Sequence, residues 1–243
     1  MLRSYHCVVR LILASASPRR AELLRAAGFE FEIVATNVDE SIRAGESPHT
    51  YVRRLAAEKS AAAMAGYVVS GFSRTDDGGR HGALDDRDGP PKGGHHVREQ
   101  YVHEDVIILG ADTAVVVDGD ILGKPGDDAD AAAMLRRLSG RRHDVMTGVS
   151  LRVGAYEVGR VEITSVEFAR LGDDDVQWYV ASGEGRDKAG AYAIQGLASR
   201  FIPRIDGSYS NVVGLPIACV TELLTEISGT RPARSSQNRS TAD

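Results

Sequence analysis

The stretch LILASASPRR, residues 11–20, passes from an apolar run to small polar residues, a proline and two arginines. This order predicts a buried strand, a tight loop and a helix that begins at Pro18, because proline suits a first helical turn in which its missing N–H would be unpaired. Ser17 can cap that helix from outside. The N–H groups at such a helix start favour an anion, and Arg19 and Arg20 stand beside them. We therefore expect a loop that binds polyphosphate; the alternative is a structural helix start that binds nothing.

A secretory signal peptide is the other alternative for this N-terminal stretch. Arg3, an apolar core and Ala14–Ala16 resemble the three regions of such a peptide. Arg10 interrupts the apolar core, however, and an amphipathic helix follows in place of a mature N-terminus. Cys7 and Cys219 both lie in apolar runs, and two thiols without a secretory signal favour a reducing compartment. We expect a cytoplasmic protein.

The composition of the chain limits its functional class. Its 243 residues suit one or two domains, and its net charge of −5 offers no broad basic face to nucleic acid. The apolar runs are too short to cross a bilayer. We therefore expect neither nucleic acid nor a membrane among the partners, and the arginines must act locally.

Helix and strand patterns alternate along the chain. Apolar residues at helical spacing predict helices over residues 18–27, from Pro48 to soon after Lys59, over about 127–139, and over 173–182 and 216–227. Short apolar or alternating runs predict strands over residues 11–14, 29–33, 106–109, 114–117, 121–122, 145–153 and 157–168. Trp178 is expected in the core, and residues 185–211 are expected to form an ordered loop with strand pieces. Interleaved strands and helices predict an α/β fold with a mixed sheet.

Residues 67–104 differ sharply from the rest in composition. They are crowded with Gly, Asp, Arg and His, and they show no sustained apolar period. Such a segment buries too little apolar surface to offset its ordering entropy, so we predict a disordered insertion. The histidines here show no metal-ligand spacing, and we expect no zinc site. The chain then divides into one domain, residues 1–228, which carries the insertion, and a polar tail over 229–243.

Two carboxylates follow predicted strands. Asp112 comes just after the apolar strand 106–109, at a strand end where ligands collect in open α/β sheets. It can hold Mg²⁺ or deprotonate a water, or it can be a turn residue that accepts backbone N–H groups. Glu40 follows a strand in the same way and is a second candidate for a metal ligand or base, although an acidic pair with Asp39 is more often simply solvated.

Lysine and amide side chains supply further candidates. Lys59, Lys124 and Lys188 are possible phosphate contacts, and Lys124 stands between a glycine and a proline that restrict the backbone. Lys188 lies in the run DKAGAY, residues 187–192, whose small residues let another group approach the main chain. Gln195 can pair with the edge of a base, because its amide offers both a donor and an acceptor; alternatively, it bonds its own backbone.

A series of short motifs occurs in a fixed order along the chain. The motifs are SASPRR at 15–20, YVRRLAAEK at 51–59, GADT at 110–113, LGKP at 122–125, LSG at 138–140, DKAGAY at 187–192, IQG at 194–196, DGSY at 206–209 and NVVGLP at 211–216. Together they resemble the Maf family of nucleoside-triphosphate pyrophosphatases, which are relatives of the ITP pyrophosphatases. The resemblance covers nearly the whole chain apart from residues 67–104 and the tail. It implies a mixed twisted sheet flanked by helices, with a central cleft.

The resemblance also implies a reaction. A nucleoside triphosphate is hydrolysed to the monophosphate and pyrophosphate with a divalent metal, Mg or Mn. The position of Asp112 is that of the family's proton acceptor, which activates water. The metal would be held by Glu40, Asp112 and Asp187. The phosphates would be held by Ser15, Ser17, Arg19, Arg20, Lys59, Lys124 and Lys188.

Three positions bear on substrate choice in the family, and they match Arg19, Thr113 and Gln195. The dTTP/UTP branch has Thr after the aspartate and Gln in the later motif, as here, whereas the 7-methyl-GTP branch has Gln and Glu. Gln195 can hydrogen-bond the O4/N3 edge of uracil or thymine, including modified pyrimidines. The alternatives are a 7-methyl-GTP or purine nucleotide pyrophosphatase of the same fold and a non-catalytic, nucleotide-binding regulator of cell division. Relatives are often dimers, so a homodimer stays open.

Overall fold

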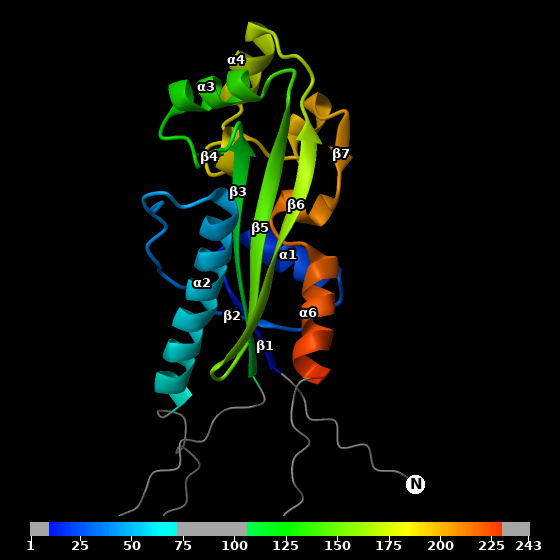
Figure 1. Cartoon of the computed structure of the whole chain (residues 1–243). Coiled ribbons are helices and arrows are strands. Elements are labelled where there is room, and N and C mark those ends of the chain that lie inside the picture. The colour runs from blue at the N-terminus through cyan, green and yellow to red at the C-terminus, as the bar shows by residue number, and fades with distance from the viewer. Residues whose placement is uncertain (1–9, 72–105, 230–243) are drawn as a thin grey trace, which may run out of the picture.

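A seven-stranded mixed sheet forms the centre of the protein, whose computed structural model describes residues 10–71 and 106–229 (Figure 1). The strands are β1 (Arg10–Ala14), β2 (Glu32–Ile33), β3 (Val106–Val117), β4 (Asp120–Leu122), β5 (Arg142–Val153), β6 (Tyr156–Glu167) and β7 (Arg204–Asp206). Their order is β2-β1-β3-β5-β6-β7, and β4 pairs with β3. The β2-β1-β3 part is parallel and the remainder antiparallel. This confirms the predicted α/β fold with a mixed sheet.

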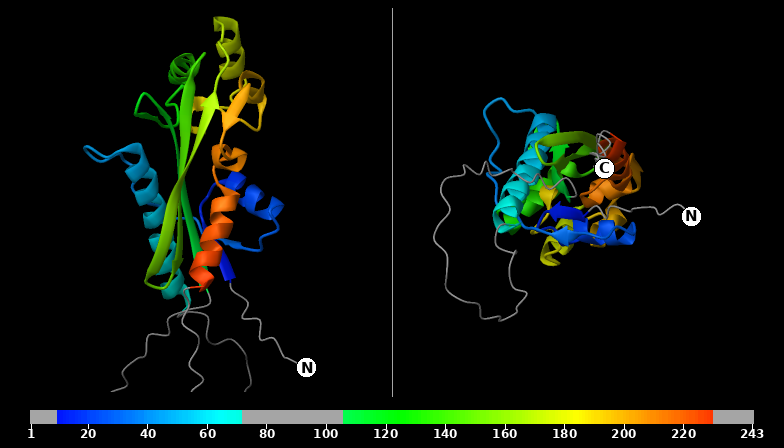
Figure 2. Two further views of the ribbon diagram at one scale, coloured as in Figure 1. Left: turned by 45° about the vertical axis from the view of Figure 1, so that its right-hand side comes forward. Right: turned by 90° about the horizontal axis from the view of Figure 1, so that it is seen from below.

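Helices cover both faces of the sheet. They are α1 (Pro18–Ala26), α2 (Pro48–Gly71), α3 (Asp128–Leu138), α4 (Asp173–Ala181), α5 (Tyr209–Val213) and α6 (Ile217–Gly229), with 3-10 turns η1 (Ala189–Ala191) and η2 (Leu197–Phe201). Figure 2 shows α2 on one face and α1 with α6 on the other, while α3 and α4 lie at one end. Within the described residues, no helix is long and apolar enough to cross a membrane.

The first strand, loop and helix form as the sequence predicts. β1 is buried, Ser17 occupies the N-cap position in an extended conformation, and α1 begins at Pro18. The Ser17 side chain makes no capping hydrogen bond, although the residue stands at the N-cap position. α1 packs Ala21 and Leu24 into the core and ends before Gly28, whose φ of 81° suits glycine at a helix terminus.

Two glycines let α2 lie directly on the sheet. A Cβ added to Gly110 of β3 would stand 2.2 Å from the carbonyl oxygen of Ala56. At Gly148 of β5 it would stand 2.1 Å from the carbonyl oxygen of Val52. These contacts are with helix backbone, which cannot rotate away, so only glycine fits. Gly148 is also the cross-strand partner of Asp112, and the helix therefore passes close to that carboxylate.

The structure differs from the prediction along β3. GADT does not follow a strand but lies within one, because Ile108–Val116 pair continuously with β5. The neighbouring β1 ends at Ala14, opposite Gly110. Asp112 therefore lies two residues beyond the point where β1 ends, so no strand among the described residues pairs with β3 on the β1 side at Asp112.

Two further expectations need correction. α2 continues to Gly71, so the first residues of the segment predicted as an insertion are helical, whereas residues 72–105 and the tail beyond Gly229 lie outside the described residues. Trp178 is not in the core but 42% exposed, with the Arg200 guanidinium 4.5 Å from its ring centroid. The core position on α4 belongs to Tyr179, one residue on.

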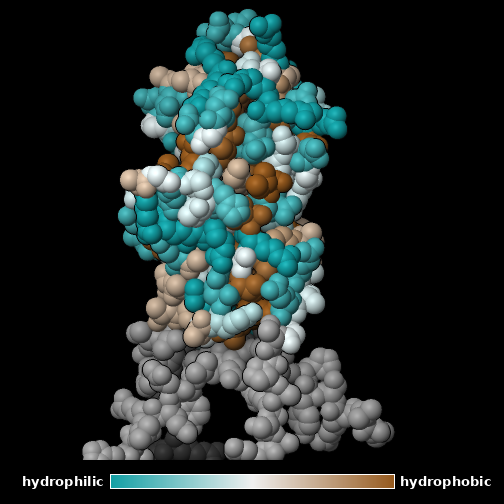
Figure 3. Space-filling view, viewed as in Figure 1, coloured by the Kyte–Doolittle hydropathy of each residue, from teal (hydrophilic) through white to brown (hydrophobic). Residues whose placement is uncertain are grey.

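The surface seen in Figure 3 is largely hydrophilic, with apolar residues exposed in small separate patches. The apolar core lies inside, on both faces of the sheet. On the α1 and α6 side it includes Leu24, Leu109 and Leu215, and Cys219 is buried there as expected. Cys7 and the histidines of the predicted insertion lie outside the described residues.

Candidate active site

A cleft of about 500 Å³ opens where β1 ends and β3 continues. It brings together all the residues predicted for catalysis, phosphate binding, metal binding and specificity. They are Ser15, Ser17, Arg19, Arg20, Glu40, Lys59, Asp112, Thr113, Lys124, Asp187, Lys188 and Gln195. The cleft thus collects side chains from the loop before α1, the middle of α2, β3 and the segment before η2.

Lys59 links two carboxylates on one side of the cleft. Its Nζ lies 2.7 Å from Oδ1 of Asp112 and 2.6 Å from Oε1 of Glu40. Lys59 and Asp112 are buried, whereas Glu40 is half exposed. Burial raises the pKa of Glu40, but the hydrogen bond and charge of Lys59, together with the charges of Lys124 and Arg20, outweigh it, so the pKa is lowered overall. Both carboxylates therefore converge on one point in the cleft.

Tyr51, for which the sequence predicted no role in the cleft, lies beside this group. Its hydroxyl donates to the backbone oxygen of Glu40 at 3.0 Å. Burial, followed by the negative charges of Asp112 and Glu40, raises its pKa to about 12. Tyr51 therefore stays protonated and fixes the loop that carries Glu40 to α2. Its place in the YVRRLAAEK motif was the available signal.

Arg20 is buried and is held almost entirely by protein. Its Nε donates to the oxygen of Gly214 at 2.8 Å, and Nη1 donates to Ser15 Oγ at 3.1 Å and to the oxygen of Ala111 at 2.8 Å. Its Nη2 donates to Thr113 Oγ1 at 3.1 Å. Burial lowers the pKa of the guanidinium, and the charge of Asp112 opposes that shift. These bonds use most of its donors, so Arg20 joins the loop before α1 to β3 and the segment before α6.

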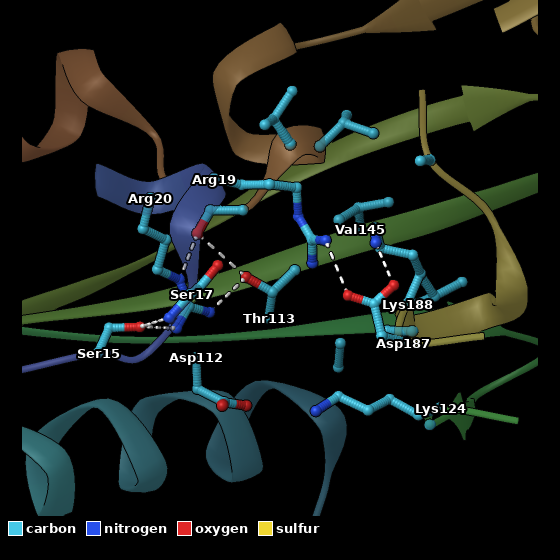
Figure 4. A pocket seen from close by; sticks show the side chains of 18 of the residues that line it. Ser15, Ser17, Arg19, Arg20, Asp112, Thr113, Lys124, Val145, Asp187 and Lys188 are labelled. Atoms are coloured by element: carbon cyan, nitrogen blue, oxygen red, sulfur yellow. Dashed lines mark hydrogen bonds and ion pairs between the residues drawn. The ribbon is translucent and has the colours of Figure 1, made fainter. Parts of the chain in front are cut away.

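Arg19, by contrast, faces the cleft. Its Nη1 lies 3.6 Å from Oδ2 of Asp187, and Lys188 contacts the other oxygen of that carboxylate. The hydrogen bond from Lys188 is the main reason that the pKa of Asp187 is lowered. Figure 4 shows these side chains along one side of the cleft, while Lys124 extends toward Asp112. The cleft wall is rich in cations that a polyanion can reach.

The two remaining specificity candidates differ in how they are held. Thr113 Oγ1 contacts Arg20, lies 3.0 Å from Thr147 Oγ1 and 3.3 Å from the oxygen of Gly214. Its hydroxyl is therefore occupied by protein. Gln195 is exposed at the cleft edge, and its amide makes no hydrogen bond to any described residue. That amide is open to a ligand.

The residues present fit a divalent cation only in part. Within residues 10–71 and 106–229, no three His, Cys, Asp or Glu side chains are grouped closely enough to hold a metal ion. Asp187 is engaged by Arg19 and Lys188 and does not join Glu40 and Asp112. Mg²⁺ is commonly held by one or two carboxylates with substrate phosphates and waters. The Glu40–Asp112 pair, which shares contacts with the ammonium of Lys59, supplies two such carboxylates, and the three-carboxylate metal site stays a prediction.

Comparisons with known proteins identify similar chains. A family model described as Maf-like protein matches residues 10–227. The chain is 44% identical over 223 residues to the dTTP/UTP pyrophosphatase of Shewanella oneidensis, covering 90% of this chain and 98% of that protein. It is 42% identical over 217 residues to the dTTP/UTP pyrophosphatase of Hahella chejuensis, covering 89% and 92%. A more distant likeness, with a TM-score of 0.41 and 14% identity, joins 91% of the chain to all of the Staphylococcus aureus Ham1 protein.

Proposed function

This chain belongs to the Maf family, and from that premise we propose that it hydrolyses dTTP and UTP to the nucleoside monophosphate and pyrophosphate. Relatives that are 42% and 44% identical carry the name dTTP/UTP pyrophosphatase. One observation carries the proposal: the cleft combines a buried carboxylate, Asp112, with a wall of cations and the open amide of Gln195. Asp112 can activate a water nucleophile, the cations can bind a triphosphate, and the Gln195 amide can recognise a nucleobase.

Asp112 serves as the general base. Lys59 donates to Oδ1, which leaves Oδ2 to accept a proton from the attacking water. Placement inside a strand, with Gly148 opposite, gives the carboxylate little freedom to move. Because phosphoryl transfer demands mainly an aligned nucleophile and charge stabilisation, a rigid base with nearby cations suffices.

Cations of the cleft wall bind the triphosphate. Arg19, Lys124 and Lys188 face the cleft, and the N–H groups at the start of α1 add their partial positive charge. Arg20 acts mainly by holding Ser15 and β3 in place, since its donors are largely used. A bound divalent cation would be held by Glu40 and Asp112 and would neutralise charge on the phosphate oxygens.

Gln195 recognises the base. Its amide can donate to O4 and accept from N3–H of uracil or thymine, and cytosine reverses both requirements. A base that leaves the amide unpaired in the cleft is therefore disfavoured. Thr113 contributes to substrate choice indirectly, by positioning Arg20 and Gly214, because its hydroxyl is hydrogen-bonded to both.

The test is a panel of nucleoside triphosphates with Mg²⁺ and with Mn²⁺, including modified pyrimidine nucleotides and 7-methyl-GTP, with the products identified. The proposal expects pyrophosphate and monophosphate from dTTP and UTP, with slower turnover of purine nucleotides. Preference for 7-methyl-GTP would keep the reaction and reject the assigned specificity. Tight nucleotide binding without any hydrolysis would instead favour a regulatory nucleotide-binding protein.

A further inference from the structure

The segment that carries Gln195 is fixed from outside the cleft. Because the Gln195 side chain has no hydrogen bond among the described residues, its direction depends on the backbone on either side, residues 193–198. This segment runs from Ala193, which is buried, into η2. Residues 193–196 form a turn closed by the hydrogen bond from the Gly196 N–H to the Ala193 oxygen at 3.1 Å, and η2 follows. Side chains outside the segment add further contacts to it.

Glu184 holds the downstream side of this segment. Its Oε1 accepts the N–H of Leu197 at 2.9 Å, and its Oε2 accepts the N–H of Ala198 at 3.4 Å. Gly196, at the N-cap of η2, has no side chain to cap the helix, so the Glu184 carboxylate accepts these N–H groups as a cap would. A Cβ at Gly196 would stand 2.0 Å from Oε1 of Glu184. The backbone therefore closes tightly on this carboxylate.

Tyr179 extends the same contact to the upstream side. Its hydroxyl donates to Oε2 of Glu184 at 2.7 Å and accepts the N–H of Ala193 at 3.1 Å. Burial and the hydrogen bond to Glu184 raise the pKa of this phenol, which stays protonated and able to donate. Both sides of Gln195 are thus tied to one pair of side chains.

The pair is itself anchored in α4 and the core. Tyr179 is 1% exposed, and its ring packs edge-on against Phe201 with 6.1 Å between centroids. Ser182 Oγ accepts the N–H of Glu184 at 3.2 Å and donates to the oxygen of Tyr179. Nothing in the proposed hydrolysis uses Glu184 or Tyr179, since neither is among the residues that line the cleft with Asp112.

We propose that Glu184, together with Tyr179, is a positioning residue for base recognition, which fixes residues 193–198 so that the Gln195 amide faces the nucleotide. This inference rests on the proposed function, because it takes Gln195 to recognise the pyrimidine edge. An amide that is placed before binding loses less conformational freedom when the base arrives. Loss of the pair weakens recognition of the base and leaves the chemical step at Asp112 intact.

Two conservative variants test the proposal. Glu184→Gln keeps the side-chain volume but puts an amide donor where backbone N–H groups need an acceptor, and Tyr179→Phe removes only the hydroxyl. We expect KM for UTP to rise about tenfold, kcat to change less than about twofold, and the preference for UTP over CTP in kcat/KM to fall about tenfold. Asp174→Asn, an exposed carboxylate on the first turn of α4, is the matched control and should leave all three values unchanged.

A double-variant cycle separates positioning from a general loss of structure. In a Gln195→Ala background, Glu184→Gln should reduce the UTP preference no further, because the residue through which it acts is gone. An equal further loss in that background overturns the inference. The inference is also overturned if Glu184→Gln and Tyr179→Phe each keep the UTP preference while Gln195→Ala loses that preference. In that case the proposed function stands. If the wild-type chain releases pyrophosphate from no nucleotide, the proposed function fails, and this inference with it.

Discussion

Replacing Gly148 with alanine should displace α2 and separate Lys59 from Asp112. The new Cβ would stand 2.1 Å from the carbonyl oxygen of Val52, whereas ordinary contacts begin at 3.4 Å. The helix must therefore move from the sheet by about 1.3 Å. Applied along the 2.7 Å contact between Lys59 Nζ and Asp112 Oδ1, that displacement separates them to about 4 Å, beyond hydrogen-bond distance.

The expected cost follows from this geometry. Forcing an extra methyl group into a packed interface destabilises proteins by about 1–3 kcal/mol. A misplacement of about 1 Å in a catalytic group costs about 100-fold in rate. Urea denaturation measures the first quantity, and kcat for UTP measures the second. The free energy of unfolding and kcat should both fall, because one displacement of α2 lowers both.

Gly66→Ala is the matched control, since Gly66 lies on the same helix and an added Cβ meets nothing within 4 Å. It should stabilise the protein by up to about 1 kcal/mol through helix propensity, with kcat unchanged. If Gly148→Ala keeps the wild-type stability and kcat, the close packing of α2 on the sheet does not position Lys59 against Asp112.

Three further predictions concern charges within or near the cleft. Lys59→Met removes the cation between Glu40 and Asp112. Breaking a buried ion pair costs about 3–5 kcal/mol, so the urea midpoint of unfolding should fall. A wild-type urea midpoint would count against the pairing. Arg20→Lys keeps one charge but cannot reproduce four separate hydrogen bonds, so the thermal midpoint should fall and a conserved midpoint would contradict the bracing role. Burial lowers the pKa of His143 to about 4, so the unfolded chain binds its proton first. Stability should therefore decline as pH falls from about 6.5 toward 4, and this slope should disappear in His143→Phe. If His143→Phe keeps this dependence of stability on pH, other titrating groups cause it.

Local signals predicted the first strand, loop and helix because each rests on neighbouring residues. The apolar run, the N-cap position of Ser17 and Pro18 at the first turn all act within one or two turns of chain. The continuity of β3 through Asp112 has no such signal. Residues 110–113 are small and polar, and pairing with β5, some 40 residues away, keeps them extended. Tertiary pairing here overrides a pattern that is typical of a turn.

The site was predictable in membership but not in arrangement. Motif residues identified the side chains named for the cleft, including Lys59 and Lys188, with the exception of Glu40, which was predicted from its place after a strand. Nothing in the sequence indicated that Arg20 donates to the backbone of Ala111 and Gly214, which are far along the chain, or that Asp187 pairs with Arg19. The exposed place of Trp178 was missed for a related reason, because helical spacing alone did not distinguish it from its neighbour Tyr179 as the core residue.

The role of Asp112 as general base is tested most directly by the rate of pyrophosphate release from UTP by Asp112→Asn, measured beside equilibrium binding of UTP. The amide keeps the shape of the side chain but cannot accept the proton of water, and general-base catalysis contributes about 100- to 10,000-fold. We expect a rate loss of that size, with UTP binding within about tenfold of wild type. Pyrophosphate release at the wild-type rate would contradict the assignment of Asp112 as the base.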